Sequence, residues 1–182
     1  MDNFLALVKK RRSIRAYREK TIPEEIIDYI LEAGRLAPSS ENLQPWKFYV
    51  VRNKSTIFKL SKAAPLKLNR YLKFIASADT IIVLVAEKKP VHWIAKLIGK
   101  DYHELDVMIA GEHMVLAATD KNIGSCWIGW FSEKKVKKIL NLKPAQKPIA
   151  MIALGYPKEE KEEVKNRLSK NKVVVFIGGK ND

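Results

Sequence analysis

The sequence predicts a layered domain in which helices pack against a β-sheet. Segments with helical periodicity alternate along the chain with short β-branched runs that indicate strands. The 182 residues, 47% of them hydrophobic, suffice for one domain with a substantial core. No internal repeat or low-complexity segment interrupts the pattern. Together these observations favour a single domain of mixed helix and strand.

Two helices are expected before the first strand. The first is predicted over residues 2–11, with its apolar residues on one face. The second is predicted to begin at Pro23, because proline suits the first position of a helix. An apolar stripe of isoleucine and leucine follows, and Gly34 and Pro38 are expected to mark the end of this helix.

Strands and further helices are expected in the rest of the chain. The run 80–86 is wholly apolar and rich in β-branched residues, which predicts a strand covered on both faces. Segment 102–121 is apolar over much of its helical circumference, so it should be buried by its own core or by a second subunit. Other strands are predicted at 46–51, 124–131 (strand or turn), 149–154 and 173–177. Another helix is predicted from a cap at Asn53 or Ser55 to about residue 62, and a further one from a cap at Ser132 to about residue 140.

Composition and charge limit the kind of protein that this chain is. The net charge of +14 suits a nucleic-acid binder, but lysines scattered beside acidic residues favour a solvated surface instead. Cys126 is the only cysteine, which excludes an intrachain disulfide and a thiolate zinc cluster. The three histidines lack the spacing of metal ligands, so no metal is expected. The chain has no apolar run long enough to cross a membrane and no signal-peptide pattern, which predicts a cytoplasmic protein.

Two polar segments carry side chains that suit a phosphorylated ligand. Segment 11–15 is Arg-Arg-Ser-Ile-Arg, and an arginine fork binds phosphate through two hydrogen bonds. Segment 37–46 is Ala-Pro-Ser-Ser-Glu-Asn-Leu-Gln-Pro-Trp, which combines hydroxyls and amides with two prolines that stiffen the loop. Taken separately, a basic helix end and an ordinary proline-bounded turn are the simpler explanations.

Taken together, the two segments resemble the nitroreductase-like family of FMN flavoproteins, whose N-terminus carries both motifs at this spacing. Segment 122–129, Asn-Ile-Gly-Ser-Cys-Trp-Ile-Gly, resembles a third motif of that family. The resemblance covers most of the chain and implies an α+β fold: a three-layer sandwich with a central, mainly antiparallel sheet flanked by helices. It also implies a homodimer in which the long helix forms the interface and a C-terminal arm, about 158–182, contacts the partner subunit.

The resemblance further implies a set of FMN contacts. Arg11 would hold the phosphate, while Arg15 would face the N1/C2 carbonyl side of the ring, where a fixed cation favours reduced flavin and raises its potential. The 38–42 loop would contact the flavin held mainly by the other subunit, and the backbone at Gly129 would approach N5. The full set is Arg11, Arg12, Ser13, Arg15, Pro38, Ser39, Ser40, Asn42, Asn69, Ile128, Gly129, Lys165 and Arg167.

Alternatives remain for three of these motifs. Asn69, placed just before a strand expected to start near residue 76, is equally explained as a helix-terminal asparagine. Lys165 and Arg167 lie in a run of charged residues that is explained equally well as a solvated surface. In the third motif, Cys126 and Trp127 are expected to pack in the core, and a reactive-thiol role for Cys126 is the alternative.

The function implied by the resemblance is that of an FMN-dependent oxidoreductase. NAD(P)H would pass a hydride to flavin N5, and a small acceptor such as a nitroaromatic, quinone or flavin would then take it, in ping-pong order. No residue is assigned to acid–base catalysis. The chain has no G-x-G-x-x-G fingerprint, so the nicotinamide would be a visiting substrate, and segment 87–100, with His92 and Trp93, is expected to cover the ring.

Two alternatives from other classes stay open: a nonenzymatic flavin- or anion-binding protein, and a basic nucleic-acid-binding protein. Salt dependence separates them, because nonspecific nucleic-acid binding falls steeply with salt whereas a buried FMN should persist. The expected partners are therefore a second copy of the chain, NAD(P)H and a small acceptor, with no nucleic acid and no membrane.

Overall fold

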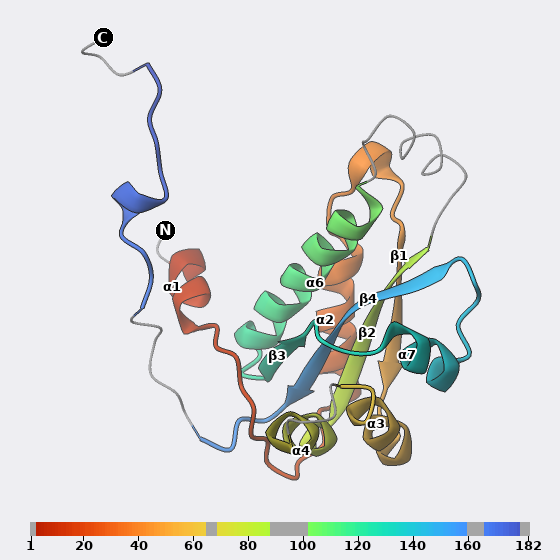
Figure 1. Ribbon diagram of the computed structural model, residues 1–182. Coiled ribbons are helices and arrows are strands. Elements are labelled where there is room, and N and C mark those ends of the chain that lie inside the picture. The colour runs from red at the N-terminus through yellow and green to blue at the C-terminus, as the bar shows by residue number, and fades with distance from the viewer. Residues whose placement is uncertain (1–2, 65–68, 88–101, 160–165, 179–182) are drawn as a thin grey trace.

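A four-stranded antiparallel sheet forms the middle of the molecule (Figure 1). The computed structural model describes residues 3–64, 69–87, 102–159 and 166–178. Within them the strand order is β1-β2-β4-β3, and each neighbouring pair is antiparallel. The strands are β1 (Trp46–Val51), β2 (Thr80–Glu87), β3 (Gly124–Ile128) and β4 (Gln146–Gly155). The predicted antiparallel sheet is confirmed.

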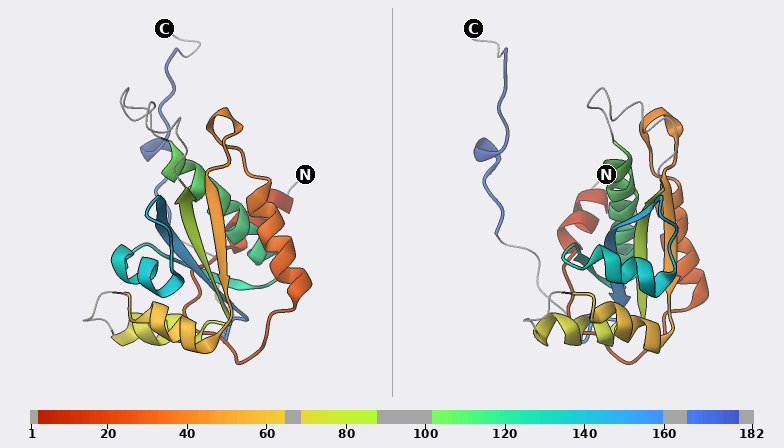
Figure 2. Two further views of the ribbon diagram at one scale, coloured as in Figure 1. Left: turned by 90° about the vertical axis from the view of Figure 1, so that its right-hand side faces the viewer. Right: turned by 45° about the vertical axis from the view of Figure 1, so that its right-hand side comes forward.

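Helices cover both faces of this sheet, which gives three layers (Figures 1 and 2). One face carries α3 (Lys54–Ser61), α4 (Asn69–Ser77) and α7 (Glu133–Leu140). The other face carries α2 (Glu24–Arg35) and α6 (His103–Asp120), and α1 (Asn3–Lys10) contacts α6. Short 3-10 turns lie at Ser40–Asn42 and Lys170–Lys172. The α+β three-layer sandwich is therefore confirmed.

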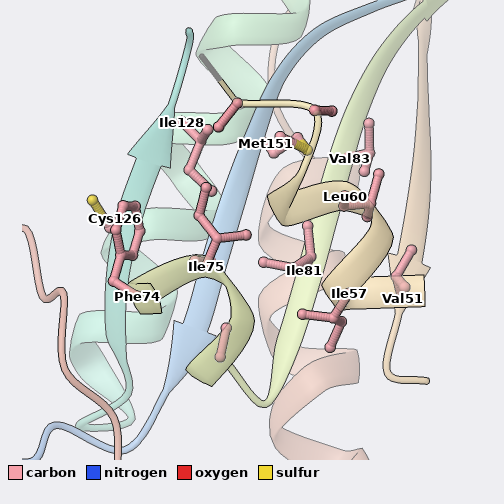
Figure 3. Close-up of a cluster of buried hydrophobic side chains, with 14 of the residues drawn as sticks. Val51, Ile57, Leu60, Phe74, Ile75, Ile81, Val83, Cys126, Ile128 and Met151 are labelled. Atoms are coloured by element: carbon pink, nitrogen blue, oxygen red, sulfur yellow. The ribbon is translucent and has the colours of Figure 1, made fainter. Parts of the chain in front are cut away.

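Strand β2 shows why the sheet needs both helical layers. Its side chains alternate between two buried clusters, with Ile81 and Val83 in one and Ile82 and Leu84 in the other. Figure 3 shows the first cluster, where α3 and α4 close over the sheet. The prediction of a strand covered on both faces is thus confirmed.

Local signals set several helix boundaries as the sequence predicts. The side chain of Asn53 accepts a hydrogen bond from the Thr56 amide and begins α3, and Ser132 does the same for α7. Gly34, however, is not the stop signal of α2. It lies inside the last turn, where an added Cβ would come within 2.2 Å of the Met114 Cε atom, so its role is the close approach of α2 to α6.

Two predictions about the chain's elements were wrong. Residues 69–77 form helix α4 and the following strand starts at Thr80, not near residue 76. Residues 173–177 form no strand, because a strand needs a neighbour's hydrogen bonds and the described part of one chain offers this segment none. Smaller differences are a shorter β3 and a longer β4 than expected. None of the helices in the described ranges is long and apolar enough to span a bilayer.

Candidate functional site

The arginine segment, residues 11–18, is attached to the sheet by backbone hydrogen bonds. Ser13 bridges Ser125 in parallel, and the Ile14 amide donates to the Ser125 carbonyl at 2.9 Å. Farther along, Tyr17 bridges Pro157, and the Arg18 amide donates to the Tyr156 carbonyl at 2.9 Å. Because the segment is bonded both to β3 and to the residues that directly follow β4, its backbone is fixed.

Tyr17 locks this segment against the end of the sheet. Its hydroxyl lies 2.8 Å from the Ile14 carbonyl oxygen and 3.2 Å from the Ala153 carbonyl oxygen. Burial raises the pKa of the Tyr17 hydroxyl well above its usual value, so it stays a neutral donor. A Cβ on Gly155 would come within 2.7 Å of the Tyr17 ring, so glycine is needed for the ring to lie this close. This anchor was not predicted from the sequence.

Replacing Tyr17 with phenylalanine should lower the free energy of unfolding by about 1 kcal/mol, because a buried hydroxyl hydrogen bond is lost. Urea denaturation measures this. The control is Tyr29→Phe, which removes an exposed hydroxyl bonded to Asp120 and should cost less than about 0.5 kcal/mol. Equal losses for the two variants would mean that the Tyr17 hydroxyl does not anchor the segment.

The three predicted arginines sit within five residues of this fixed backbone. Arg11 and Arg12 are half-buried, and Arg15 is exposed beside Tyr17, whose pKa its charge lowers as a minor contribution. Ser13 is half-buried where the segment meets β3. The segment therefore presents three guanidinium groups and a hydroxyl on one stretch of chain, which suits an anionic ligand.

The second predicted segment, residues 38–44, forms a compact loop. The Ser39 hydroxyl accepts a hydrogen bond from the Gln44 amide at 2.9 Å, and the Gln44 side chain donates to Asn42. Glu41, Asn42 and Gln44 all have left-handed backbones, with φ between 47° and 54°. Pro38 and Ser40 are exposed on this loop. Its hydroxyls and amides are thus held on a tight, self-bonded turn.

Asp106 of α6 fixes this loop and was not predicted. Its Oδ1 atom accepts a hydrogen bond from the Ser40 amide at 3.2 Å, although the two residues lie 66 positions apart. The Asp106 side chain is buried, and within the described residues its Oδ2 atom has no hydrogen-bond partner. An acidic residue in an otherwise apolar stretch of helix was the only signal available in the sequence.

One chain does not bring the two predicted segments together. The loop lies against Asp106 near the start of α6, whereas Arg12 shares a cavity with Thr119 at the end of this helix. From Asp106 to Thr119 a helix rises about 20 Å, at roughly 1.5 Å per residue. Figures 1 and 2 show the two segments at opposite ends of the molecule. A site that uses both needs a second chain.

The end of β3 offers an open stretch of backbone. Ile128 is buried, but the next residue, Gly129, is exposed, and a Cβ built on it would meet no heavy atom within 4 Å. Trp130 beside it is 72% exposed. A planar ligand could therefore approach the main chain at Gly129 directly.

The remaining predicted residues are less well defined. Asn69 begins α4, but its side chain lies outside the described residues, as do Lys165, His92 and Trp93. Arg167 is exposed and its guanidinium donates to the Asn166 carbonyl, so nothing in the chain brings it to the other arginines. Cys126 is buried in the hydrophobic cluster of Figure 3, as expected of a packing residue. The described ranges contain no group of three or more potential metal ligands.

Comparisons with known proteins agree on one family. The family model described as Nitroreductase family matches residues 8–70 and 65–156. A relative from Archaeoglobus fulgidus, provisionally named NADH dehydrogenase/NAD(P)H nitroreductase, is 34% identical over 166 residues, which are 89% of this chain and 90% of that protein. The NADH dehydrogenase of Thermus thermophilus is 31% identical over 175 residues, 83% of this chain and 85% of that protein. An FMN-dependent nitroreductase structure from Clostridium difficile is 29% identical with a TM-score of 0.81, covering 96% of this chain and 99% of that one.

Proposed function

The chain belongs to the nitroreductase family, and from that premise we propose that it is an FMN-dependent oxidoreductase that takes its electrons from NAD(P)H. The observation that carries the proposal is the family match over residues 8–70 and 65–156, which includes both polar segments and the open glycine. Its relatives are named NAD(P)H nitroreductase and NADH dehydrogenase, which supports a nicotinamide as the reductant.

The residues present fit FMN. Arg11, Arg12 and Ser13 stand on a backbone bonded to β3 and provide charged donors for a phosphate. Gly129 leaves main chain uncovered where a flat ring could lie. When bound, FMN would supply the redox chemistry, taking a hydride from NAD(P)H in one half-reaction and giving it to a nitroaromatic, quinone or flavin in the next. The chain's own residues bind and orient, and we assign none of them to acid–base catalysis.

We propose that the active form is a homodimer with a site built from both chains. The supporting observation is apolar surface left open on the helices near α6. Phe4 and Leu5 on α1 are both 63% exposed, and Leu105 on α6 is 59% exposed. Exposed apolar side chains on these helices are typical of an interface between copies. Pairing through α6 would place the 38–44 loop of one chain near the arginine segment of the other.

The C-terminal arm supports the same arrangement. Figures 1 and 2 show residues 166–178 standing apart from the sheet and helices. Val175, Phe176 and Ile177 are 84%, 80% and 94% exposed, which is costly for three consecutive apolar residues unless another chain covers them. We propose that this arm packs against the partner subunit, which would cover these apolar side chains.

Arg15 should affect the redox potential of bound FMN more than it affects the affinity for FMN. A fixed cation near the ring stabilises the negative charge that reduction adds, so Arg15→Gln should lower the potential of bound FMN. A differential interaction of roughly 1–2 kcal/mol corresponds to about 20–45 mV, since 30 mV is about 1.4 kcal/mol for a two-electron couple. A potential titration of the purified variant measures the shift. An unchanged potential with flavin still bound would show that Arg15 lies away from the ring.

The function itself is tested by following the visible absorbance of bound flavin under anaerobic conditions. NADH or NADPH alone should bleach it, and a nitroaromatic or quinone added afterwards should restore it, because the two half-reactions are separate. Bleaching that requires both substrates together would contradict the ping-pong order. A protein that binds flavin but is bleached by neither nicotinamide would favour the nonenzymatic alternative.

A further inference from the structure

Gly129, at the end of β3, has no reason within its own chain to be a glycine. Elsewhere in the described residues, a Cβ on Gly34, Gly111, Gly124 or Gly155 would come within 3.0 Å of a neighbouring side chain, and Gly178 has a positive φ of 75°. Gly129 shows neither feature, since a Cβ there would meet no heavy atom within 4 Å and its φ lies outside the left-handed region. Because glycine costs backbone entropy on folding, its presence here is best explained by a molecule outside the chain that comes close to the backbone.

The next residue, Trp130, exposes its indole although the chain around it is held in place. Ile128 is buried in the cluster of Figure 3, and Phe131 packs against that same cluster. The Ser132 amide then donates to the Ala63 carbonyl at 2.8 Å, where α7 begins. Phe131 therefore takes the inward position, and the Trp130 side chain stays at the surface on a fixed backbone.

The indole of Trp130 makes no contact within the chain that explains a tryptophan at this position. Trp127 donates from its indole to the Glu112 carboxylate at 3.3 Å, and Trp46 stacks on Phe48 with ring centroids 6.3 Å apart. In the part of the chain that the structure describes, Trp130 has neither a hydrogen bond from its side chain nor a ring contact. A covered tryptophan buries roughly 150–250 Å², so an indole left in solvent forfeits a large stabilising contribution that a ligand could supply.

Gly129 and Trp130 together form a surface that suits two stacked planar rings. The flavin ring is proposed to lie against the open backbone of Gly129. Consecutive Cα atoms are about 3.8 Å apart, so the Trp130 side chain starts next to the backbone that the flavin would cover. A molecule that takes a hydride from the flavin must bring its reacting atom to about 3–3.5 Å from the ring, which places it beside the same indole.

We propose that Trp130 is a specificity-determining residue for the acceptor. Its indole contacts the ring of the acceptor and favours planar aromatic molecules, such as quinones and nitroaromatics, over acceptors without a ring. The inference rests on the proposed function, since it takes the flavin to lie at Gly129. Trp130 adds affinity and takes no part in hydride transfer, so its loss should change the binding of the acceptor and not the chemical step.

Calorimetric titration of the flavin-loaded protein with 2-naphthol, a planar aromatic molecule that accepts no hydride, measures this contact without turnover. Trp130→Ala should weaken the binding of 2-naphthol about tenfold, because a stacked ring is removed. Trp130→Phe, which keeps a smaller ring, should lie between the wild type and Trp130→Ala. The control is Phe58→Ala, which removes an exposed ring from α3 and should leave the affinity unchanged.

Steady-state kinetics give a second readout. With NADH in excess, Trp130→Ala should raise the KM for menadione, a quinone, about tenfold and leave kcat within about twofold, because binding falls equally in the ground state and the transition state. The kcat/KM for ferricyanide, an acceptor without an aromatic ring, should stay unchanged.

Equal affinity for 2-naphthol in Trp130→Ala and the wild type, or no binding to either, would overturn the inference and leave the proposed function in place. Loss of FMN or of the dimer in Trp130→Ala would also overturn it, because Trp130 would then belong to the cofactor site or to the interface. Bound flavin that neither nicotinamide bleaches would contradict the proposed function, but the 2-naphthol titration would still decide the role of Trp130, since it needs no electron transfer. A wild-type protein that binds no FMN would contradict both.

Discussion

Replacing Arg11 with alanine should weaken FMN binding by about ten- to a hundredfold. A hydrogen bond from a charged donor to phosphate contributes roughly 1.5–3 kcal/mol, and each 1.4 kcal/mol is about tenfold in affinity. Arg11 directly follows α1 on a segment whose next residues are bonded to β3, so its loss should not be compensated by movement of the backbone. Fluorescence titration of the flavin-free protein with FMN measures the affinity.

The control for this variant is Lys137→Ala on α7. Lys137 forms an ion pair with Glu133, four residues earlier on α7, and lies far along the chain from the arginine segment. The Lys137→Ala substitution therefore removes one positive charge without changing the proposed site. Its FMN affinity should equal that of the wild type. Equal weakening in both variants would show that the overall charge of +14, and not a fitted arginine, attracts the anion.

A negative charge at an apolar position of α6 should dissociate the proposed dimer and release its FMN. Leu105 is 59% exposed in the single chain, and in the proposed dimer it would be covered by the partner. Leu105→Asp would bury an unpaired carboxylate in each copy, at a cost of about 3 kcal/mol or more, so the dimer should weaken by at least a hundredfold. FMN should be lost too, because the 38–44 loop of the partner would no longer reach it.

Phe58→Asp on α3 provides the matched control. Phe58 is 52% exposed, but it lies on the helical layer across the sheet from α6. This variant should remain dimeric and retain FMN. If Leu105→Asp stayed dimeric with its flavin bound, α6 would not form the interface and the shared site would need another geometry.

The sequence predicted those features that depend on local chemistry. The apolar run of β2, the side-chain cap of Asn53 and the helical pattern of α6 each lie within a few residues, and each was found where expected. Helix α4 was missed although Tyr71, Leu72 and Ile75 follow helical spacing, because it is short and directly precedes the buried strand β2. The terminal segment 173–177 has the composition of a strand. A strand also needs backbone hydrogen bonds to a neighbouring strand, and composition does not show whether a neighbour is present.

The motifs of the candidate site could be predicted from the sequence, but the contacts that hold these motifs in place could not. Resemblance picked out the arginine segment and the 38–44 loop, whose residues are adjacent in sequence. The anchors of these segments, Tyr17 on Gly155 and Asp106 on Ser40, join residues far apart in the chain and could be found only in the fold.

Sedimentation velocity of the purified protein, recorded at a wavelength that flavin absorbs, tests the central claim most directly. We propose that FMN is held between two copies of this chain, so the flavin signal should move with a particle of two chains and account for one FMN per chain. Flavin that sediments with a single chain would contradict the shared site, and a dimer that carries no flavin would contradict the cofactor.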